Sequence, residues 1–404
     1  MRIGMITGEY PPMQGGVGAF TEQLSRALCD RGHTVHILTA CADEPSVQGD
    51  VSVGPQVERT VRSWGLPSIL RIRRWIADRQ VDVVNLQYEA AAFGMRAGMN
   101  FLPSLRSTVP GVPLVVTFHD LLPPYLFPKA GRLRDWSVRH LARTADGAIV
   151  TNHDDLRGLT EHHIDDETPV RLIPIGSNIS PTPPPDYSKE RWRAAHGFAP
   201  VRTAGSVSPG DHPLVVGFFG FLNRSKGVET LIAAIARLAE EGRPVHLLFI
   251  GGRTGTSDQS NVAYASEIDA LIEELGITPR VHRTGFASPT EVSAALYAVD
   301  VCALPYREGA NLRHGTLHAA LAHACPIVTT QSRHPVPELV DGREALLVPP
   351  DDAEALANAI RALADDDELR RDLSAAAARL AARFTWPAIA AETEAFFASL
   401  RMVE

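Results

Sequence analysis

Lys226 lies where a side chain could bind an anion. It belongs to a glycine-containing turn, 217–227, which follows the apolar segment 213–216 and precedes a segment with apolar residues at helical spacing. A turn of this kind presents backbone N–H groups and the positive end of a helix to an anion. The chain has three lysines among 39 basic residues, so a lysine here favours a compact ammonium over a guanidinium. The alternative is an ordinary surface lysine at the start of a helix.

Polar residues and glycines also follow apolar segments in the first half of the chain. They are residues 15–18, residues 87–89, and His119 with Asp120. If the segments are parallel strands, ligands collect outside their carboxyl ends. His119 is therefore a candidate for substrate contact, and the alternative is a neutral imidazole hydrogen-bonded by Asp120. The glycines of 15–18 lack the spacing of a dinucleotide-binding fingerprint, which disfavours a Rossmann dehydrogenase.

Short apolar segments alternate with amphipathic segments throughout the chain, and this pattern predicts an α/β fold with doubly wound parallel sheets. The expected strands are 3–7, 34–38, 81–86, 114–118, 147–150 and 170–174, then 214–219, 245–250, 281–284, 301–304 and 326–329. The proline-rich segment 180–186 between the two series is typical of a stiff linker. We therefore expect two domains, residues 1–180 and 181–385, followed by a helix within 386–404.

The composition excludes several classes of protein. With 404 residues, 45% of them hydrophobic and 21% charged, the chain is typical of a soluble globular protein. The formal net charge of −8 argues against general nucleic-acid binding. We expect a cytoplasmic protein, because there is no membrane-spanning run or signal-peptide pattern and the four cysteines are scattered. The basic segment 129–143 predicts a solvated helix, and the alternative is weak peripheral association with the inner face of a membrane.

Seven motifs follow one another along nearly the whole chain. They are 15–17 (Gly-Gly-Val), 219–227 (Phe-Gly-Phe-Leu-Asn-Arg-Ser-Lys-Gly), 248–252 (Leu-Phe-Ile-Gly-Gly), 283–286 (Arg-Thr-Gly-Phe), 304–309 (Leu-Pro-Tyr-Arg-Glu-Gly), 320–330, and 336–342 with 346–349. Each motif alone is weak, but their order resembles that of the retaining GT-B glycosyltransferases of family 4, the glycosyl transferases group 1.

The resemblance implies two Rossmann-like domains that face each other across a cleft. Residues 1–180 would bind the acceptor and residues 181–385 the nucleotide sugar, with the helix of 386–404 packed back on the N-terminal domain. The implied enzyme is a retaining, metal-independent hexosyltransferase without a cofactor. It would move a hexose from a UDP- or GDP-type sugar to a glycan, glycolipid or small-molecule acceptor, as in polysaccharide biosynthesis.

The resemblance also implies roles for individual residues. His119 would contact the transferred hexose, Lys226 would stabilise the departing diphosphate, and Glu308 would lie near the donor sugar. The implied donor-binding set is Gly16, Val17, Arg224, Lys226, Gly285, Glu308, Gly309, Ala310, Asn311, Leu312 and Thr316, and no metal ligand is expected. Acceptor specificity would depend on the loops 87–93, 121–134 and 151–154.

Two departures from the family pattern concern the donor site. Phe221 stands where the family has an arginine, and Arg224 is the candidate to replace that cation. The second glutamate of the family's Glu-x7-Glu pattern is also missing, because Thr316 stands eight residues after Glu308, and alignment through Pro326 places Ala319 there instead. The loop is then three residues longer, with residues 313–315 in or beside the extra length, and Thr316 is a candidate to contact the ribose.

Two other functions fit the same architecture. A sugar-nucleotide 2-epimerase needs additional acid–base carboxylates in the cleft, and the sequence shows no obvious pair. A non-catalytic nucleotide-sugar-binding protein would explain the missing arginine and glutamate. The presence of His119, Lys226 and Glu308 argues against it.

Overall fold

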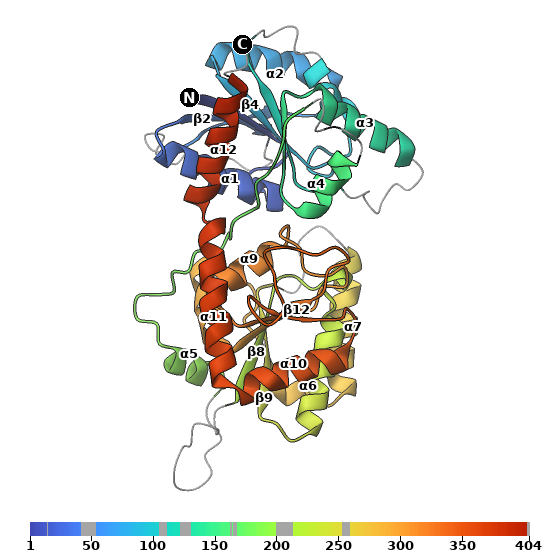
Figure 1. Ribbon diagram of the computed structural model, residues 1–404, viewed down its shortest axis with the longest axis vertical. Helices are drawn as coiled ribbons and strands as arrows, with labels where there is room; N and C mark the ends of the chain where they lie inside the picture. Colours follow the sequence, from blue (N-terminus) through green and yellow to red (C-terminus); the bar gives the residue numbers. More distant parts are fainter. Residues whose placement is uncertain are drawn as a thin grey trace. The chain divides into compact units, whose positions relative to one another are not determined.

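The computed structural model describes residues 1–13, 15–41, 54–104, 111–121, 131–161, 164, 168–198, 213–252 and 259–401. The chain divides into two compact units (Figure 1). Residues Met1–Asn178 and Phe384–Glu404 form the N-terminal unit, and residues Ile179–Arg383 form the C-terminal unit.

The described part of the N-terminal unit contains a seven-stranded parallel sheet in the order β3-β2-β1-β4-β5-β6-β7. Its strands are β1 (Arg2–Thr7), β2 (Thr34–Ala40), β3 (Gln56–Val61), β4 (Val83–Tyr88), β5 (Leu114–Phe118), β6 (Gly147–Val150) and β7 (Val170–Leu172). The six strands expected here are confirmed, with ends within two residues of those predicted. The edge strand β3 was missed because its sequence is mostly polar and only half-buried.

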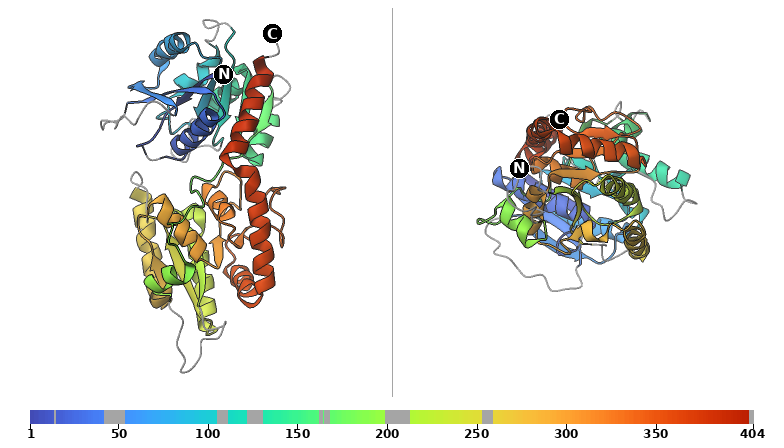
Figure 2. Two further views of the ribbon diagram at one scale, coloured as in Figure 1. Left: turned by 90° about the vertical axis from the view of Figure 1, so that its left-hand side faces the viewer. Right: turned by 90° about the horizontal axis from the view of Figure 1, so that it is seen from below.

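Helices cover both faces of this sheet because successive strand residues point to opposite sides. Val84 and Val116 pack on one side, and their neighbours Val83 and Val115 pack on the other. The helices of this unit are α1 (Gly16–Asp30), α2 (Leu66–Arg79), α3 (Gly131–Thr144), α4 (His153–Thr160) and α12 (Trp386–Arg401), with a short 3₁₀ helix η1 (Ala97–Phe101). The C-terminal helix α12 packs beside α1, where Phe396 and Phe397 join the apolar face of α1 (Figures 1 and 2).

The described part of the C-terminal unit contains a six-stranded parallel sheet in the order β10-β9-β8-β11-β12-β13. Its strands are β8 (Leu214–Phe219), β9 (Val245–Ile250), β10 (Val281–Arg283), β11 (Val301–Leu304), β12 (Ile327–Thr330) and β13 (Leu346–Val348). The five strands expected here are confirmed, and the three-residue strand β13 is additional.

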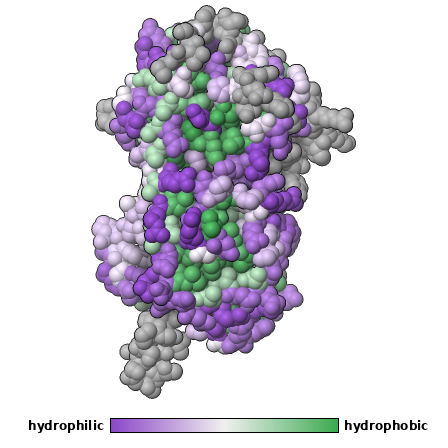
Figure 3. Space-filling view, viewed as in Figure 1, coloured by the Kyte–Doolittle hydropathy of each residue, from purple (hydrophilic) through white to green (hydrophobic). Residues whose placement is uncertain are grey.

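Helices surround this second sheet in the same way. They are α5 (Lys189–Ala195), α6 (Val228–Glu240), α7 (Gln259–Glu274), α8 (Pro289–Ala298), α9 (Gly315–Ala322), α10 (Ala353–Asp365) and α11 (Asp367–Ala381), with 3₁₀ turns η5 (Arg224–Lys226) and η6 (Thr278–Arg280), and η7 (Ala382–Phe384) at the end of the unit. The buried faces of α6 and α10 pack against each other and against β8 and β9. Figure 1 draws α6 and α10 at the lower edge of this unit, and Figure 3 shows hydrophilic residues along that edge.

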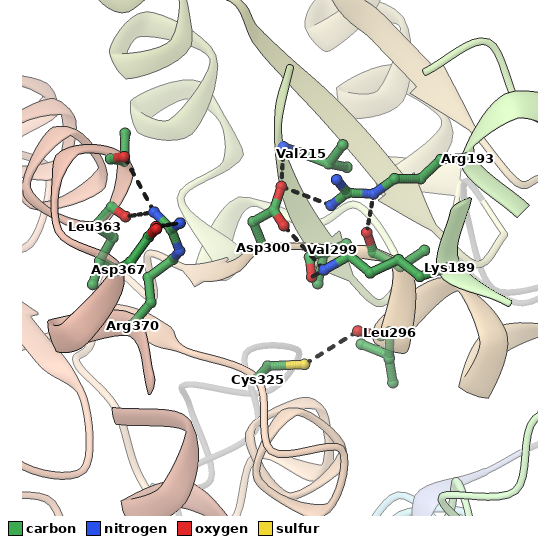
Figure 4. A network of polar contacts seen from close by, with 12 residues as sticks. Lys189, Arg193, Val215, Leu296, Val299, Asp300, Cys325, Leu363, Asp367 and Arg370 are labelled. Atoms are coloured by element: carbon green, nitrogen blue, oxygen red, sulfur yellow. Dashed lines mark hydrogen bonds and ion pairs between the residues drawn. The ribbon is translucent and has the colours of Figure 1, made fainter. Parts of the chain in front are cut away.

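A network of ion pairs fastens α5 to the amino ends of β8 and β11. Asp300 accepts a hydrogen bond from Lys189 at 3.0 Å and another from the backbone N–H of Val215 at 2.9 Å, and it forms an ion pair with Arg193 at 2.6 Å (Figure 4). A hollow of about 990 Å³ lies beside this network, lined in part by the starts of β8 and β9. Because ligands of parallel sheets bind at the carboxyl ends of the strands, this hollow lies at the wrong end for a substrate.

No described helix is both long and apolar enough to cross a lipid bilayer.

Candidate active site

Each sheet has a point where the strand order changes direction. It lies between β1 and β4 in the N-terminal unit and between β8 and β11 in the C-terminal unit. Loops diverge there at the carboxyl ends of the strands and leave room for a ligand. The residues that follow these four strands are therefore candidates for ligand binding in each unit.

The turn that holds Lys226 is fastened to the end of β11. Gly227 has a φ of +61°, and a Cβ atom at this position would lie 2.1 Å from the carbonyl oxygen of Pro305. The backbone N–H of Arg307 donates to the carbonyl of Ser225 at 3.0 Å. Only a glycine allows this approach, so the turn after β8 and the segment after β11 form one rigid surface.

The Lys226 ammonium lies in a partly desolvated position. Its Nζ is 4.8 Å from the centre of the Tyr306 ring, and no hydrogen-bond or ion-pair partner for it is found within the described part of the chain. Burial, together with the positive charge of Arg313, lowers the pKa of Lys226 to about 8. An approaching anion would stabilise an ammonium in this position, because it supplies the counter-charge that water no longer supplies.

Arg313 supplies a second positive charge beside Lys226. Its side chain is 17% exposed, and its Nη2 donates to Oε2 of Glu308 at 2.8 Å. Glu308 itself is 63% exposed, so its carboxylate lies at the edge of the surface. The cluster therefore contains two cations and one carboxylate that solvent or a ligand can reach.

The backbone of 309–312 is largely committed to internal hydrogen bonds. The N–H of Gly309 donates to Tyr306 at 3.1 Å, that of Ala310 to Thr330 at 2.9 Å, and that of Asn311 to Nδ1 of His314 at 3.2 Å. Leu312 is the fourth amide expected to face a diphosphate, and no hydrogen bond from it is found among the described residues. Gly309 has a φ of +86°, and a Cβ there would lie 2.4 Å from Cα of Ser332.

Tyr306 joins the remaining parts of this cluster. Its hydroxyl is 2.6 Å from the Thr316 hydroxyl at the start of α9, and its ring stacks on His314 at a centroid distance of 3.9 Å. Burial, with the nearby charges of Lys226 and Arg313, lowers the pKa of His314 well below its usual range, so this imidazole is neutral. Thr316 therefore lies beside Tyr306 and next to the donor-side loop.

Arg224 has a different environment from Arg313. Its guanidinium donates twice to Glu267 on α7, at 2.7 and 2.6 Å, and lies 5.1 Å from the centre of the Tyr264 ring. Phe221 is exposed at the end of β8. Gly285 has a φ of +70° in the turn after β10, directly before the exposed Phe286.

A carboxylate of the chain itself occupies the start of α1 in the N-terminal unit. Oε1 of Glu9 accepts from the backbone N–H groups of Val17 and Gly18, both at 3.0 Å. A Cβ on Gly15 would lie 2.0 Å from the same oxygen, so glycine makes room for the carboxylate. The amide expected to face a ligand at Val17 is therefore hydrogen-bonded to Glu9, while the neighbouring Gly16 is exposed.

His119 is half-buried at the carboxyl end of β5. Its Nε2–H donates to Oε1 of Gln87 at 2.8 Å, and its ring makes an edge contact with Phe20 at 4.8 Å. Burial lowers the pKa of His119 to about 3, so the imidazole is neutral at physiological pH. The nearby Glu89 is also perturbed, because burial and the carboxylates of Glu9 and Asp120 raise its pKa to about 7.

The structure brings some predicted residues together and separates others. Lys226 and Thr316 both lie beside Tyr306, and Glu308 is ion-paired with Arg313, whose charge acts on Lys226. Arg224 points to α7 instead. Glu9 and Tyr306 were not predicted as site residues from the sequence; the position of each just after a strand was the available signal.

The described residues include no group of three or more His, Cys, Asp or Glu side chains placed to hold a metal ion. The loops expected to contact an acceptor are described at 87–93 and 151–154, whereas residues 122–130 lie outside the described part of the chain.

Two family profiles match the chain. The one described as "Glycosyl transferases group 1" matches residues 213–366, and the one described as "Glycosyl transferase 4-like domain" matches residues 15–176. Between them they cover every described strand of both sheets except β1.

Individual proteins resemble the chain over its whole length. The D-inositol 3-phosphate glycosyltransferase of Corynebacterium diphtheriae is 27% identical over 436 residues, which cover 100% of this chain and 96% of that protein. The structure of a sucrose-phosphate synthase from Thermosynechococcus elongatus matches with a TM-score of 0.76 and 21% identity, over 100% of both chains. HepE of Anabaena, solved with UDP and glucose, matches with a TM-score of 0.73 and 19% identity, over 99% of this chain and 100% of that one. The GT-B fold expected from the motifs is confirmed.

Proposed function

The chain belongs to the group 1 glycosyltransferases of the GT-B fold, and from that premise we propose that it transfers a hexose, with retention, from a nucleoside diphosphate sugar. The observation that carries the proposal is the ammonium of Lys226, for which the described residues offer no hydrogen-bond or ion-pair partner, beside Arg313 at the strand-order switch point of the C-terminal sheet. Two cations at this position suit a diphosphate better than a neutral ligand.

The chemistry requires stabilisation of a departing diphosphate. When the bond between C1 of the sugar and the phosphate oxygen breaks, negative charge accumulates on that oxygen and positive charge on the sugar. The protonated Lys226 stabilises the negative charge on the departing phosphate oxygen. The proton of the acceptor hydroxyl then passes to that oxygen as the new glycosidic bond forms. Because the acceptor enters on the face that the leaving group occupied, the sugar keeps its anomeric configuration.

Side chains supply the positive charge in this proposal, so no divalent metal is required. Lys226 and Arg313 together bring two positive charges to the position of the diphosphate. Transfer should therefore continue unchanged in millimolar EDTA. A loss of activity that added Mg²⁺ or Mn²⁺ restores would contradict this part of the proposal.

His119 contributes as a neutral hydrogen-bonding group to the hexose. Its pKa of about 3 makes it a poor base, and Nε2–H is already directed to Gln87, so Nδ1 is the atom that remains to accept a hydroxyl proton. We expect His119→Ala to reduce transfer while the affinity for the free nucleoside diphosphate stays the same.

The acceptor we propose to test first is a small phosphorylated polyol. The support is the name of the full-length relative, a D-inositol 3-phosphate glycosyltransferase. Glycans and glycolipids are the other acceptor classes. For a lipid-linked acceptor, α3 would approach the membrane with Trp136, which is 53% exposed, and co-sedimentation with anionic vesicles would detect this.

The deciding experiment combines binding with product analysis. Isothermal titration with UDP and GDP should show binding of at least one, and donor hydrolysis or transfer should release that nucleotide. ¹H NMR of the product should show the anomeric configuration of the donor. Binding of neither nucleotide at millimolar concentration, with no hydrolysis of any sugar nucleotide, would overturn the proposal. An epimerase would instead convert the donor without any acceptor.

A further inference from the structure

Two arginines among the described residues are considered as replacements for the missing diphosphate cation at position 221. Arg224 lies in the same turn as Lys226, and Arg313 comes from the loop between β11 and α9. Their partners and exposure distinguish them, because a cation that serves a buried anion must itself be directed into the site.

Arg224 is directed out of the site. Its guanidinium forms a two-fold hydrogen bond to Glu267 and covers the ring of Tyr264, and its side chain is 60% exposed. A move toward Lys226 would break both contacts. Arg224 therefore links η5 to α7 through Glu267.

Arg313 is far less exposed than Arg224. Its side chain is 17% exposed, against 60% for Arg224, and its Nη2 donates to Glu308 at 2.8 Å. In keeping with this position, its charge contributes to the lowered pKa of both Lys226 and His314. Burial makes the larger contribution in each case. The backbone N–H of Arg313 donates to Oδ1 of Asn311 at 3.1 Å, which fixes the loop that presents the side chain.

We propose that Arg313, not Arg224, is the second cation that contacts the donor diphosphate. The inference rests on the proposed function. In the free protein Glu308 partly neutralises Arg313 through their 2.8 Å ion pair. A guanidinium has five N–H donors, so Arg313 contacts a phosphate oxygen while it also holds Glu308 at the edge of the donor sugar. The loop residue thus joins the phosphate part of the site to the sugar part.

The first test compares Arg313→Gln with Arg224→Gln as a matched pair. UDP, or GDP if the wild type prefers it, should bind about 10- to 100-fold more weakly to Arg313→Gln, because a charge-assisted hydrogen bond is lost. The corresponding free nucleoside, which has no phosphate, should bind equally to both variants and to the wild type. Arg224→Gln should bind the diphosphate within about twofold of the wild type. Arg313→Lys should recover part of the lost affinity.

The second test does not depend on a ligand. The chain has three lysines, so reductive methylation with ¹³C-formaldehyde gives three lysine signals and one from the N-terminal amine. Lys226→Arg identifies its signal by loss. The pKa read from that signal should rise in Arg313→Gln and stay unchanged in Arg224→Gln, because Arg313 is the one of these two arginines whose charge adds to the effect of burial on Lys226.

Two outcomes would overturn the inference. If Arg313→Gln binds the diphosphate as tightly as the wild type but loses transfer as Glu308→Gln does, then Arg313 only positions Glu308. If Arg224→Gln is the variant that loses affinity, then Arg224 is the second cation. Failure of the wild type to bind any nucleoside diphosphate would instead refute the proposed function, so the two failures are distinguishable. Circular dichroism of each variant identifies a loss caused by misfolding.

Discussion

The low pKa of Lys226 predicts an alkaline limit to the activity of the free enzyme. With a pKa of about 8, about nine-tenths of the ammonium is protonated at pH 7 and about one-tenth at pH 9. If only the protonated form binds the donor productively, kcat/KM should fall about tenfold between these two values. The limit for kcat should lie at higher pH, because a bound diphosphate favours the charged ammonium.

The assay is a pH series of kcat/KM and kcat measured by release of nucleoside diphosphate. Lys226→Arg is the control, because arginine stays protonated throughout the range. It should lower activity at pH 7, since a planar guanidinium replaces a compact ammonium, but it should remove the alkaline limit. An alkaline limit that persists in Lys226→Arg would refute the assignment to Lys226.

The burial of Lys226, which should favour binding of the donor, should also make the folded protein less stable near neutral pH. The folded-state pKa of Lys226 is lower than the unfolded value, so the unfolded state binds more protons between about pH 8 and the ordinary lysine pKa of 10.5. The destabilisation is fully present below pH 8 and disappears as the pH rises toward 10.5. Lys226→Met should therefore abolish activity and yet raise the melting temperature at pH 7, with the gain disappearing near pH 10.5. A lower melting temperature for Lys226→Met at pH 7 would contradict this reasoning.

Three further substitutions test other parts of the structure. Glu9→Ala removes the carboxylate from the start of α1 and should lower the free energy of unfolding by about 1 kcal/mol in urea titrations. Glu22→Ala is the control, because Glu22 is a half-buried glutamate within α1 whose carboxylate pairs with the exposed Arg26 rather than with the backbone at the start of the helix. Asp300→Asn breaks the ion pairs to Lys189 and Arg193 and should lower the free energy of unfolding by about 2–4 kcal/mol. Burial raises the pKa of Asp300, but the two cations and the Val215 N–H lower it overall. The extra stability of the wild type over this variant should therefore disappear as the pH falls through that depressed pKa. Gly227→Ala should lower the free energy of unfolding by more than about 1 kcal/mol and abolish turnover, because its Cβ would collide with Pro305 and its φ is +61°. Gly242→Ala is the control: its φ is +77° but its Cβ meets no neighbour, so it should reduce stability and leave turnover intact.

The sequence predicted those elements whose buried residues leave a regular pattern. Apolar runs such as 114–118 identify strands covered on both faces, and the strand is found at Leu114–Phe118. The strand β3 lies at the sheet edge, with polar residues and no apolar run, so periodicity could not find it. The strand β13 was also not predicted, because its three residues are too few to show a period.

The positions of site residues after strands were predictable, but their partners were not. A neutral imidazole hydrogen-bonded by Asp120 was the alternative to substrate contact for His119; its low pKa makes the imidazole neutral, and its Nε2–H donates to Gln87 on the neighbouring strand. That partner depends on the register of β4 against β5, which the local sequence does not contain. The choice between Arg224 and Arg313 likewise depends on Glu267, which lies on α7 far along the chain.

The position of α12 has a consequence for synthesis of the protein on the ribosome. Ile389, Phe396 and Phe397 complete an apolar cluster of the N-terminal unit, and a Cβ on Gly147 would lie 2.8 Å from Leu400. The rest of that unit leaves the ribosome long before this helix, and the residues in between need roughly 10–40 s at 5–20 residues per second. During that interval the nascent N-terminal half exposes the apolar face of α1 that α12 later covers. A chaperone therefore has a defined binding surface on the unfinished chain, and a chain truncated before residue 384 never covers it.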